Sequence, residues 1–167
     1  MVIPRGVEYV VGGYVVDDQR VLLLWHSDLA RWVPAGGRIR LAAGEYPHEA
    51  VERKVAEECG LVVTVIDCSG TTVADEFASP LPAPAAVQEI RLQPGVGYLD
   101  FVYFCRVVGG ELSLNYIEAR AYHWFDLEDL KRFPLVPHVR NYAQLALERS
   151  QLDQPAGDHL LPAESNR

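Results

Sequence analysis

The chain has 167 residues, 49% of them apolar, with 15 basic and 23 acidic side chains and a formal net charge of −8. This length and composition are typical of one globular domain that buries its own core, and they exclude a disordered chain or a disulfide-stabilised miniprotein. The acidic balance argues against a nucleic-acid backbone or an anionic membrane surface as the main partner, because both attract basic patches. It is compatible with a site that binds divalent cations.

The cysteines and the apolar runs predict the compartment. Cys59, Cys68 and Cys105 are widely spaced and form no C-x-x-C pair, so we expect three buried thiols in a reducing environment. No apolar run approaches the ~18 residues of a membrane helix, and the first residues lack the order of a secretory signal. We therefore expect a cytoplasmic protein with no membrane partner.

The first half of the chain predicts a β-hairpin followed by a helix. Residues 7–16 and 20–25 are rich in β-branched and aromatic side chains and flank a polar turn, which is typical of two paired strands. Residues 32–37 form an irregular glycine-rich approach to a short strand expected at 38–40. The best helix candidate spans residues 47–59.

The signals at both ends of this helix support its boundaries. Pro47 suits a first helical position, Glu49 lies in the first turn, and Gly60 follows where a helix stops. Tyr46 stands at the cap position, so the usual Ser or Thr cap is missing. A strand is expected next, at residues 61–67.

The second half predicts a long surface loop, two strands and two helices. Residues 69–94 are irregular and proline-rich, residues 98–108 and 121–125 have strand composition, and residues 127–133 and 139–149 have helical patterns separated by prolines.

The domain organisation follows from these elements. We see no internal repeat and no interdomain linker, so residues 1–150 are expected to form a single domain that mixes helices and strands. Residues 151–167 are polar and are expected to be a flexible C-terminal tail.

Residues 36–61 carry the most specific pattern, GGRIRLAAGEYPHEAVERKVAEECGL. The segment resembles the Nudix box, in which a glycine and a glutamate are followed by seven residues and then by Arg-Glu-apolar-x-Glu-Glu-x-Gly-apolar. The positions that carry the resemblance are Glu45, Arg53, Glu57, Glu58 and Gly60. The resemblance implies an α+β Nudix fold, with a mixed β-sheet sandwiched between helices.

Two positions depart from the pattern. Seven residues separate Gly37 from Glu45, whereas the family has five, and we expect the extra pair to bulge outward without moving the helix. The second departure is Lys54, which stands where the family has a glutamate that serves as a metal ligand or general base.

Inside this segment, the adjacent carboxylates of the helix predict a metal site. Glu57 and Glu58 are adjacent carboxylates, and oxygen ligands of this kind suit Mg²⁺ or Mn²⁺ completed by substrate phosphates and water. Arg53 precedes Glu57 by four residues and is expected to hold its side chain in place, while Lys54 lies about one turn before both glutamates. The alternative is an exposed helix with ordinary surface ion pairs, each worth ~0.2–0.5 kcal/mol.

Lys54 has three possible roles. Near the carboxylates, its ammonium would compete with a metal ion for the same negative charge. Its long stem can instead reach solvent or a substrate phosphate, and we assign Lys54 to substrate binding.

Two further acids are named by the resemblance. Glu45 corresponds to the first glutamate of the box, a metal ligand or a neighbour of one. Glu118 stands six residues before Trp124, and in several family members a functional glutamate precedes the strand with this Trp. Glu118 is therefore a candidate general base, with a solvated loop carboxylate as the alternative.

Other polar and aromatic residues give weaker signals. Four histidines lack metal-ligand spacing and are expected to have surface or packing roles, and three aromatic residues could stack on a base but are more typical of core. Four acids could line the entrance, with nothing to rank them. These residues are His26, His48, His123 and His138; Phe77, Tyr98 and Tyr103; and Asp75, Glu76, Glu89 and Asp100.

The resemblance implies a metal-dependent hydrolase that cleaves a diphosphate linkage in a nucleoside diphosphate joined to another moiety. Two alternatives stay open. One is a Nudix-fold nucleotide-binding or sensor module with weak or no catalysis, which Lys54 favours. The other is an enzyme similar to GDP-mannose mannosyl hydrolases.

The expected partner is a small nucleotide and not a nucleic acid. The specificity loop is expected within residues 69–97, and the oligomeric state stays open, with a homodimer among the alternatives.

Overall fold

The predicted β-hairpin opens the fold. In the computed structural model, which describes residues 6–70, 73–93, 95–117 and 119–153, strand β1 (Gly6–Asp17) turns into the antiparallel strand β2 (Arg20–His26). The short strands β3 (Arg31–Val33) and β4 (Ala35–Arg38) follow and pair with β2 and β1.

The rest of the sheet forms around the long strand β7 (Val96–Gly110). β7 runs parallel to β1 and antiparallel to both β5 (Leu61–Val65) and β6 (Ala86–Gln93), while β8 (Ala121–Phe125) pairs with β2. The main path through this mixed sheet is β3-β2-β1-β7-β5. The parallel pairing of β1 with β7 brings residues 6–16 beside residues 96–106 at the centre of the sheet.

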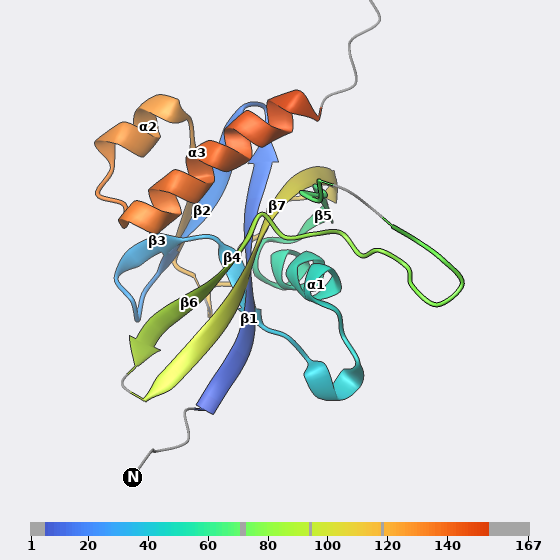
Figure 1. Ribbon diagram of the computed structural model, residues 1–167. Coiled ribbons are helices and arrows are strands. Elements are labelled where there is room, and N and C mark those ends of the chain that lie inside the picture. Colours follow the sequence, from blue (N-terminus) through green and yellow to red (C-terminus); the bar gives the residue numbers. More distant parts are fainter. Residues whose placement is uncertain (1–5, 71–72, 94, 118, 154–167) are drawn as a thin grey trace, which may run out of the picture.

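Helices cover both faces of the sheet, as expected (Figure 1). α1 (Pro47–Cys59) packs on one face, and α2 (Leu127–Arg132) and α3 (Pro137–Leu152) lie on the other; η1 (Leu41–Ala43) is a single 3-10 turn before α1. None of the helices in the described part of the chain combines the length and apolar character that crossing a membrane requires.

Alternation along β1 explains the two cores. Val11 and Val15 belong to the core under α1, whereas Tyr14 and Val16 belong to the core under α3. Because successive side chains of a strand point to opposite faces, a strand buried on both sides reads as a continuous apolar run. This is why residues 10–16 are apolar without interruption.

A close approach sets how α1 sits on the sheet. Val51 and Val55, the apolar stripe of α1, are fully buried. A Cβ added to Gly13 of β1 would lie 2.6 Å from Cγ2 of Val51, so the glycine leaves the room that the helix occupies. The helix ends at Gly60 in the left-handed region, with φ of +70°, as glycine permits.

Several predicted boundaries differ from the structure. The strand expected at 38–40 is β4 at Ala35–Arg38, because Gly36 and Gly37 pair directly with β1. The irregular segment 69–94 contains β6, whose pairing with β7 overrides the weak local pattern. α3 extends through Leu152, two residues into the expected tail, with Ser150 buried and Asp153 paired with Arg106 at 2.7 Å.

The expected division into domain 1–150 and tail 151–167 stays a prediction for the C-terminus, because residues 154–167 lie outside the described part. Of the three thiols, Cys59 and Cys105 are buried and Cys68 is half-buried, and all three are free. Burial raises the pKa of Cys59 to about 12, so this thiol is inert at neutral pH.

Candidate active site

The side of α1 that faces away from the core presents a dense charged cluster. Arg53 donates from Nε to Oε1 of Glu45 at 2.5 Å, from Nη2 to Oε2 of Glu45 at 3.0 Å, and from Nη1 to Oε2 of Glu57 at 3.0 Å. Nη2 also donates to the backbone carbonyl of Arg38 at 3.0 Å. One guanidinium thus ties α1 to the end of β4 and to the loop before the helix.

Arg40 closes the cluster from the loop side. Its backbone N–H donates to Oε2 of Glu45 at 2.7 Å, and its Nη2 donates to Oε1 of Glu57 at 3.0 Å. Both oxygens of Glu45 and both oxygens of Glu57 therefore accept hydrogen bonds, most of them charge-assisted.

Lys54 lies between the two adjacent glutamates and does not extend into solvent. Its Nζ lies 3.2 Å from Oε1 of Glu58 and 3.7 Å from Oε2 of Glu57. The residue is only 8% exposed and Glu58 only 6%. A buried charge is tolerated when it is paired, and here each of these buried groups meets the opposite charge.

Two glycines of β4 make room for Lys54 and contact Glu58. A Cβ on Gly37, whose φ is +154°, would lie 2.7 Å from Cε of Lys54. The backbone N–H of Gly36 donates to Oε1 of Glu58 at 3.2 Å. The glycine pair therefore makes the space for the lysine stem and supplies a donor to the carboxylate that the lysine contacts.

The electrostatics keep the outer carboxylates ionised. The hydrogen bond from Arg53, followed by the backbone donor and charge of Arg40, holds the pKa of Glu45 below its ordinary value. Burial alone would raise the pKa of Glu57, but the hydrogen bond and charge of Arg53 and the charges of Lys54 and Arg40 lower it.

The donor set fits a hard divalent cation in kind but not as it is arranged. Carboxylate oxygens are the ligands that Mg²⁺ and Mn²⁺ prefer, and Glu57 and Glu58 are adjacent. Among the described residues, however, no group of three or more His, Cys, Asp or Glu side chains is placed to hold a metal. A cation would have to share Glu57 and Glu58 with Lys54 and Arg40 and take further oxygen ligands from substrate.

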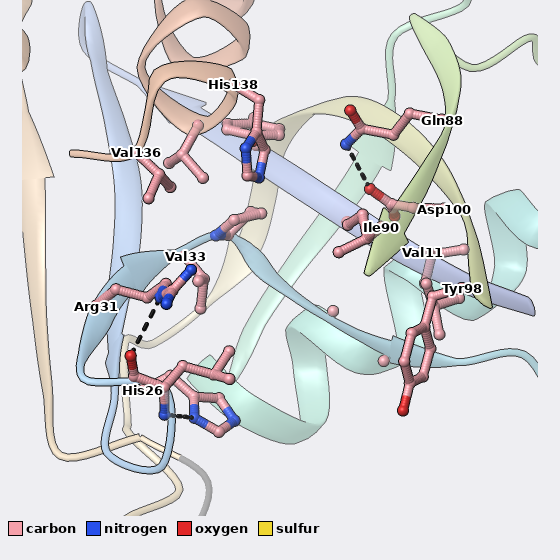
Figure 2. Close-up of a pocket in the computed structure, with 18 of the residues that line it drawn as sticks. Val11, His26, Arg31, Val33, Gln88, Ile90, Tyr98, Asp100, Val136 and His138 are labelled. Atoms are coloured by element: carbon pink, nitrogen blue, oxygen red, sulfur yellow. Dashed lines mark hydrogen bonds between the residues drawn. The ribbon is translucent and has the colours of Figure 1, made fainter. Parts of the chain in front are cut away.

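The charged cluster borders a cavity of about 310 Å³, which Figure 2 shows in close-up. Glu58, Gly36 and Gly37 help to line this cavity. This volume is within the usual range of small-molecule sites. The rest of the lining comes from β1, β6, β7, the segment from the end of β2 through β4, and the start of α3. It consists of Val10, Val11, Gly12, Tyr14, His26, Leu29, Arg31, Val33, Pro34, Arg38, Gln88, Ile90, Tyr98, Asp100, Val136, His138 and Val139.

The structure ranks one acid that the sequence could not rank. Asp100 lies on β7, is 5% exposed and lines the cavity. Oδ2 of Asp100 accepts a hydrogen bond from Nε2 of Gln88 on β6 at 2.9 Å. The sequence did carry a signal, because Asp100 is the one charged residue within the apolar and aromatic run of residues 96–105.

The remaining predicted residues fall in different places. His26, His138 and Tyr98 line the cavity, whereas Phe77 is 90% exposed on the proline-rich loop and Tyr103 is buried in the core. Glu118, the candidate base, lies outside the described residues. The structure thus brings Glu45, Arg53, Lys54, Glu57 and Glu58 into one cluster and adds the cavity beside it.

Comparison with known proteins decides the family. The family model of the NUDIX domain matches residues 7–146. The chain belongs to the Nudix family. The family expected from residues 36–61 is confirmed, and with it the α+β Nudix fold.

Known Nudix proteins share the fold at low identity. The curated protein "Putative nudix hydrolase 1" of Caenorhabditis elegans is 26% identical over an alignment of 150 residues, which covers 85% of this chain but only 35% of that protein. A crystal structure of a NUDIX-family hydrolase from Clostridium perfringens matches with a TM-score of 0.72 at 25% identity, over 87% of this chain and 98% of that one. The expected Nudix class is therefore confirmed at the level of the family.

A third match is the crystal structure of an ADP-ribose pyrophosphatase from Streptococcus suis. Its TM-score is 0.55 at 19% identity, over 89% of this chain and 96% of that one. At this identity the match shows the shared fold alone.

The Arg53 cluster of this Nudix domain predicts a pH-dependent stability. The lowered pKa values of Glu45 and Glu57 contribute stability that is fully present above their unfolded value of about 4.3 and is lost as the pH falls through the lower folded values. Arg53→Gln should lower the free energy of unfolding by about 1–3 kcal/mol at pH 7, and the difference from wild type should shrink below about pH 4. Urea unfolding across a pH series measures both.

Arg132→Gln is the matched control, because it removes the same charge from an exposed residue of α2 and should leave stability nearly unchanged at every pH. A pH-independent loss in Arg53→Gln would show that Arg53 stabilises by packing and not through its carboxylates.

Proposed function

We propose that the protein is a metal-dependent Nudix hydrolase that cleaves the diphosphate linkage of a nucleoside diphosphate joined to another moiety. The observation that carries this proposal is that the carboxylate cluster of α1 opens, through Glu58 and the two glycines of β4, into a cavity of small-molecule size. The Nudix family and the name of the fold-related ADP-ribose pyrophosphatase support the same class of substrate.

The proposed metal is Mg²⁺ or Mn²⁺. Glu57 and Glu58 would hold it, with Glu45 as a further ligand or as a neighbour that fixes the site. A bound divalent cation neutralises charge that develops on phosphate oxygens and lowers the pKa of a water molecule. The two adjacent carboxylates fit this task because such metals take one or two carboxylates and complete their coordination with substrate phosphates and water.

Arg53 and Lys54 have distinct proposed roles. Arg53 orients Glu45 and Glu57 through the four hydrogen bonds of its guanidinium. Lys54 would bind a substrate phosphate by turning its ammonium from Glu58 toward the incoming oxygens, since a lysine acts as a mobile point charge for phosphate. This movement would also release Glu58 to a cation.

A second candidate function rests on the same lysine. If Lys54 stays between Glu57 and Glu58 when nucleotide enters, the domain would bind the nucleotide without cleaving it. The 8% exposure of Lys54 and its contact with Glu58 at 3.2 Å favour this binding module. Turnover separates the two functions.

The test is a screen of nucleoside diphosphate and triphosphate derivatives with Mg²⁺ or Mn²⁺ in ¹⁸O-labelled water. Cleavage at the diphosphate places ¹⁸O on a phosphate of the product, whereas attack at a sugar carbon places it on the sugar. Binding without turnover would establish the binding module, and label on the sugar would establish a mannosyl hydrolase-like reaction.

Lys54→Glu should strengthen Mn²⁺ binding, measured by titration calorimetry, by about tenfold or more. The change removes a competing cation and adds an acid beside two carboxylates, and a tenfold gain corresponds to about 1.4 kcal/mol. Lys54→Gln, which removes the cation alone, should fall between Lys54→Glu and wild type.

Glu57→Gln and Glu58→Gln should have the opposite effect to Lys54→Glu. Each removes a proposed ligand and should therefore weaken Mn²⁺ binding. Unchanged binding in both would contradict the metal assignment. Loss of nucleotide affinity in Lys54→Glu without a gain in Mn²⁺ binding would show that Lys54 serves the substrate alone.

Glu118 is the proposed general base, because the box has a lysine where the family has its usual acid. Glu118→Gln retains size and polarity but removes the base, so it should lower kcat by roughly 10²-fold or more with little change in KM. Steady-state kinetics across a pH series measure this effect. Full activity at every pH would move the search for a base to residues 69–100.

A further inference from the structure

Asp100 is a buried acid that the charged cluster on α1 does not explain. It lies in the middle of β7, opposite Val10 of the parallel strand β1, and is 5% exposed. Within the described residues, the hydrogen bond that it accepts comes from the neutral amide of Gln88. Burial raises the pKa of Asp100, because it disfavours the charged form, and the hydrogen bond from Gln88 only partly opposes this.

The carboxylate is accessible from the cavity although it is buried from bulk water. Asp100 and Gly12 both line the cavity, and a Cβ added to Gly12 would lie 3.5 Å from Oδ1 of Asp100. The missing side chain of Gly12 therefore leaves open space beside this oxygen. Oδ2 already accepts from Gln88, so Oδ1 is the atom that a ligand can reach.

The cavity has two chemically different sides. Figure 2 shows Asp100 and Gln88 together on one side and Arg31 and His26 on the other. Apolar residues such as Ile90 line the space near the carboxylate. A flat apolar body with a polar edge directed at Asp100 suits this distribution, because small-molecule sites combine apolar walls with a few orienting polar groups.

The acceptors of Asp100 and Gln88 determine which polar edge of a ligand is complementary to the cavity. An ionised carboxylate only accepts hydrogen bonds, and a glutamine whose NH₂ donates to Asp100 retains a carbonyl oxygen as a second acceptor. Two neighbouring acceptors are complementary to two neighbouring N–H donors. Guanine carries such a pair on its ring N–H and amino group, whereas adenine and uracil place an acceptor beside each donor.

We propose that Asp100 and Gln88 determine substrate specificity by accepting hydrogen bonds from adjacent N–H donors of a guanine base, so that the substrate is a guanosine diphosphate derivative. This rests on the proposed function for the site as a whole. A site built to hydrogen-bond one edge rejects analogues that lack it, because its buried polar groups are then left unpaired. The buried acid is then retained for recognition at the expense of stability.

The test compares GDP, ADP and UDP binding to the wild-type protein and to Asp100→Asn by titration calorimetry without metal. Wild type should bind GDP at least about tenfold more tightly than ADP or UDP. Asp100→Asn is isosteric but places a donor where an acceptor is needed, so it should weaken GDP binding by about 10–100-fold and leave ADP and UDP nearly unchanged. In turnover assays, KM for guanosine derivatives should rise with kcat nearly constant.

Matched variants separate recognition from folding and charge. Glu111→Gln removes the same charge from an exposed acid that does not line the cavity and should leave all three affinities unchanged. Asp100→Asn should melt at or above the wild-type temperature at pH 7, because it removes a buried charge. If Asp100→Asn does not fold, Gln88→Met tests the same edge and should weaken GDP binding by about 3–10-fold.

The outcomes distinguish this proposal from the proposed function. GDP binding that depends on Asp100 without any turnover would support recognition and overturn the hydrolase. Turnover with no preference for guanine, a preference for adenine or uracil, or equal GDP binding in wild type and Asp100→Asn would overturn the proposal for Asp100 while leaving the hydrolase intact. Absence of nucleotide binding would overturn it as well.

Discussion

The guanidinium of Arg53 is the interaction on which the rest of the site depends. It joins three separate parts of the chain, namely the loop acid Glu45, the helix acid Glu57 and the carbonyl of Arg38 at the end of β4. The buried stripe of α1 fixes how the helix lies on the sheet, and Arg53 fixes the loop and β4 relative to that helix. The glycines that line the cavity are thereby held against Lys54 and Glu58.

The cluster is nearly neutral within itself. Three carboxylates, on Glu45, Glu57 and Glu58, are matched by the cations of Arg53, Arg40 and Lys54. In a Nudix domain with a glutamate at the position of Lys54, the same region would carry a net negative charge and attract a divalent cation strongly. Here, any cation that binds has to compete with side chains that already occupy the carboxylates.

Much of the framework was predictable, because its signals are local. Pro47 and Gly60 mark the ends of α1, and the spacing from Glu45 to Glu58 identifies the family without any structure. β6 was not predictable in the same way, because residues 86–93 become a strand through pairing with β7. The strand expected at 38–40 lies at residues 35–38 instead, because Gly36 and Gly37 pair with β1.

The features of the site that the sequence could not predict also depend on contacts between distant segments. The sequence places Lys54 beside both glutamates on the helix, but whether its stem turns toward solvent or inward depends on β4, where Gly37 leaves the space for it. Asp100 could be recognised as unusual within its strand. Its burial and its access to the cavity depend on Gly12 and Gln88, which belong to distant segments.

The parallel pairing of β1 with β7 also bears on how the molecule is made. Residues 6–16 find their partners only at residues 96–106, so a ribosome must deliver most of the domain before the centre of the sheet can close. Until then, β1 can pair with β2 and β4 and pack against α1, but its edge toward β7 has no partner strand. Non-local pairing of this kind slows folding and lengthens the exposure of an unpaired strand edge, so the newly synthesised chain is the form most exposed to aggregation and to chaperone binding.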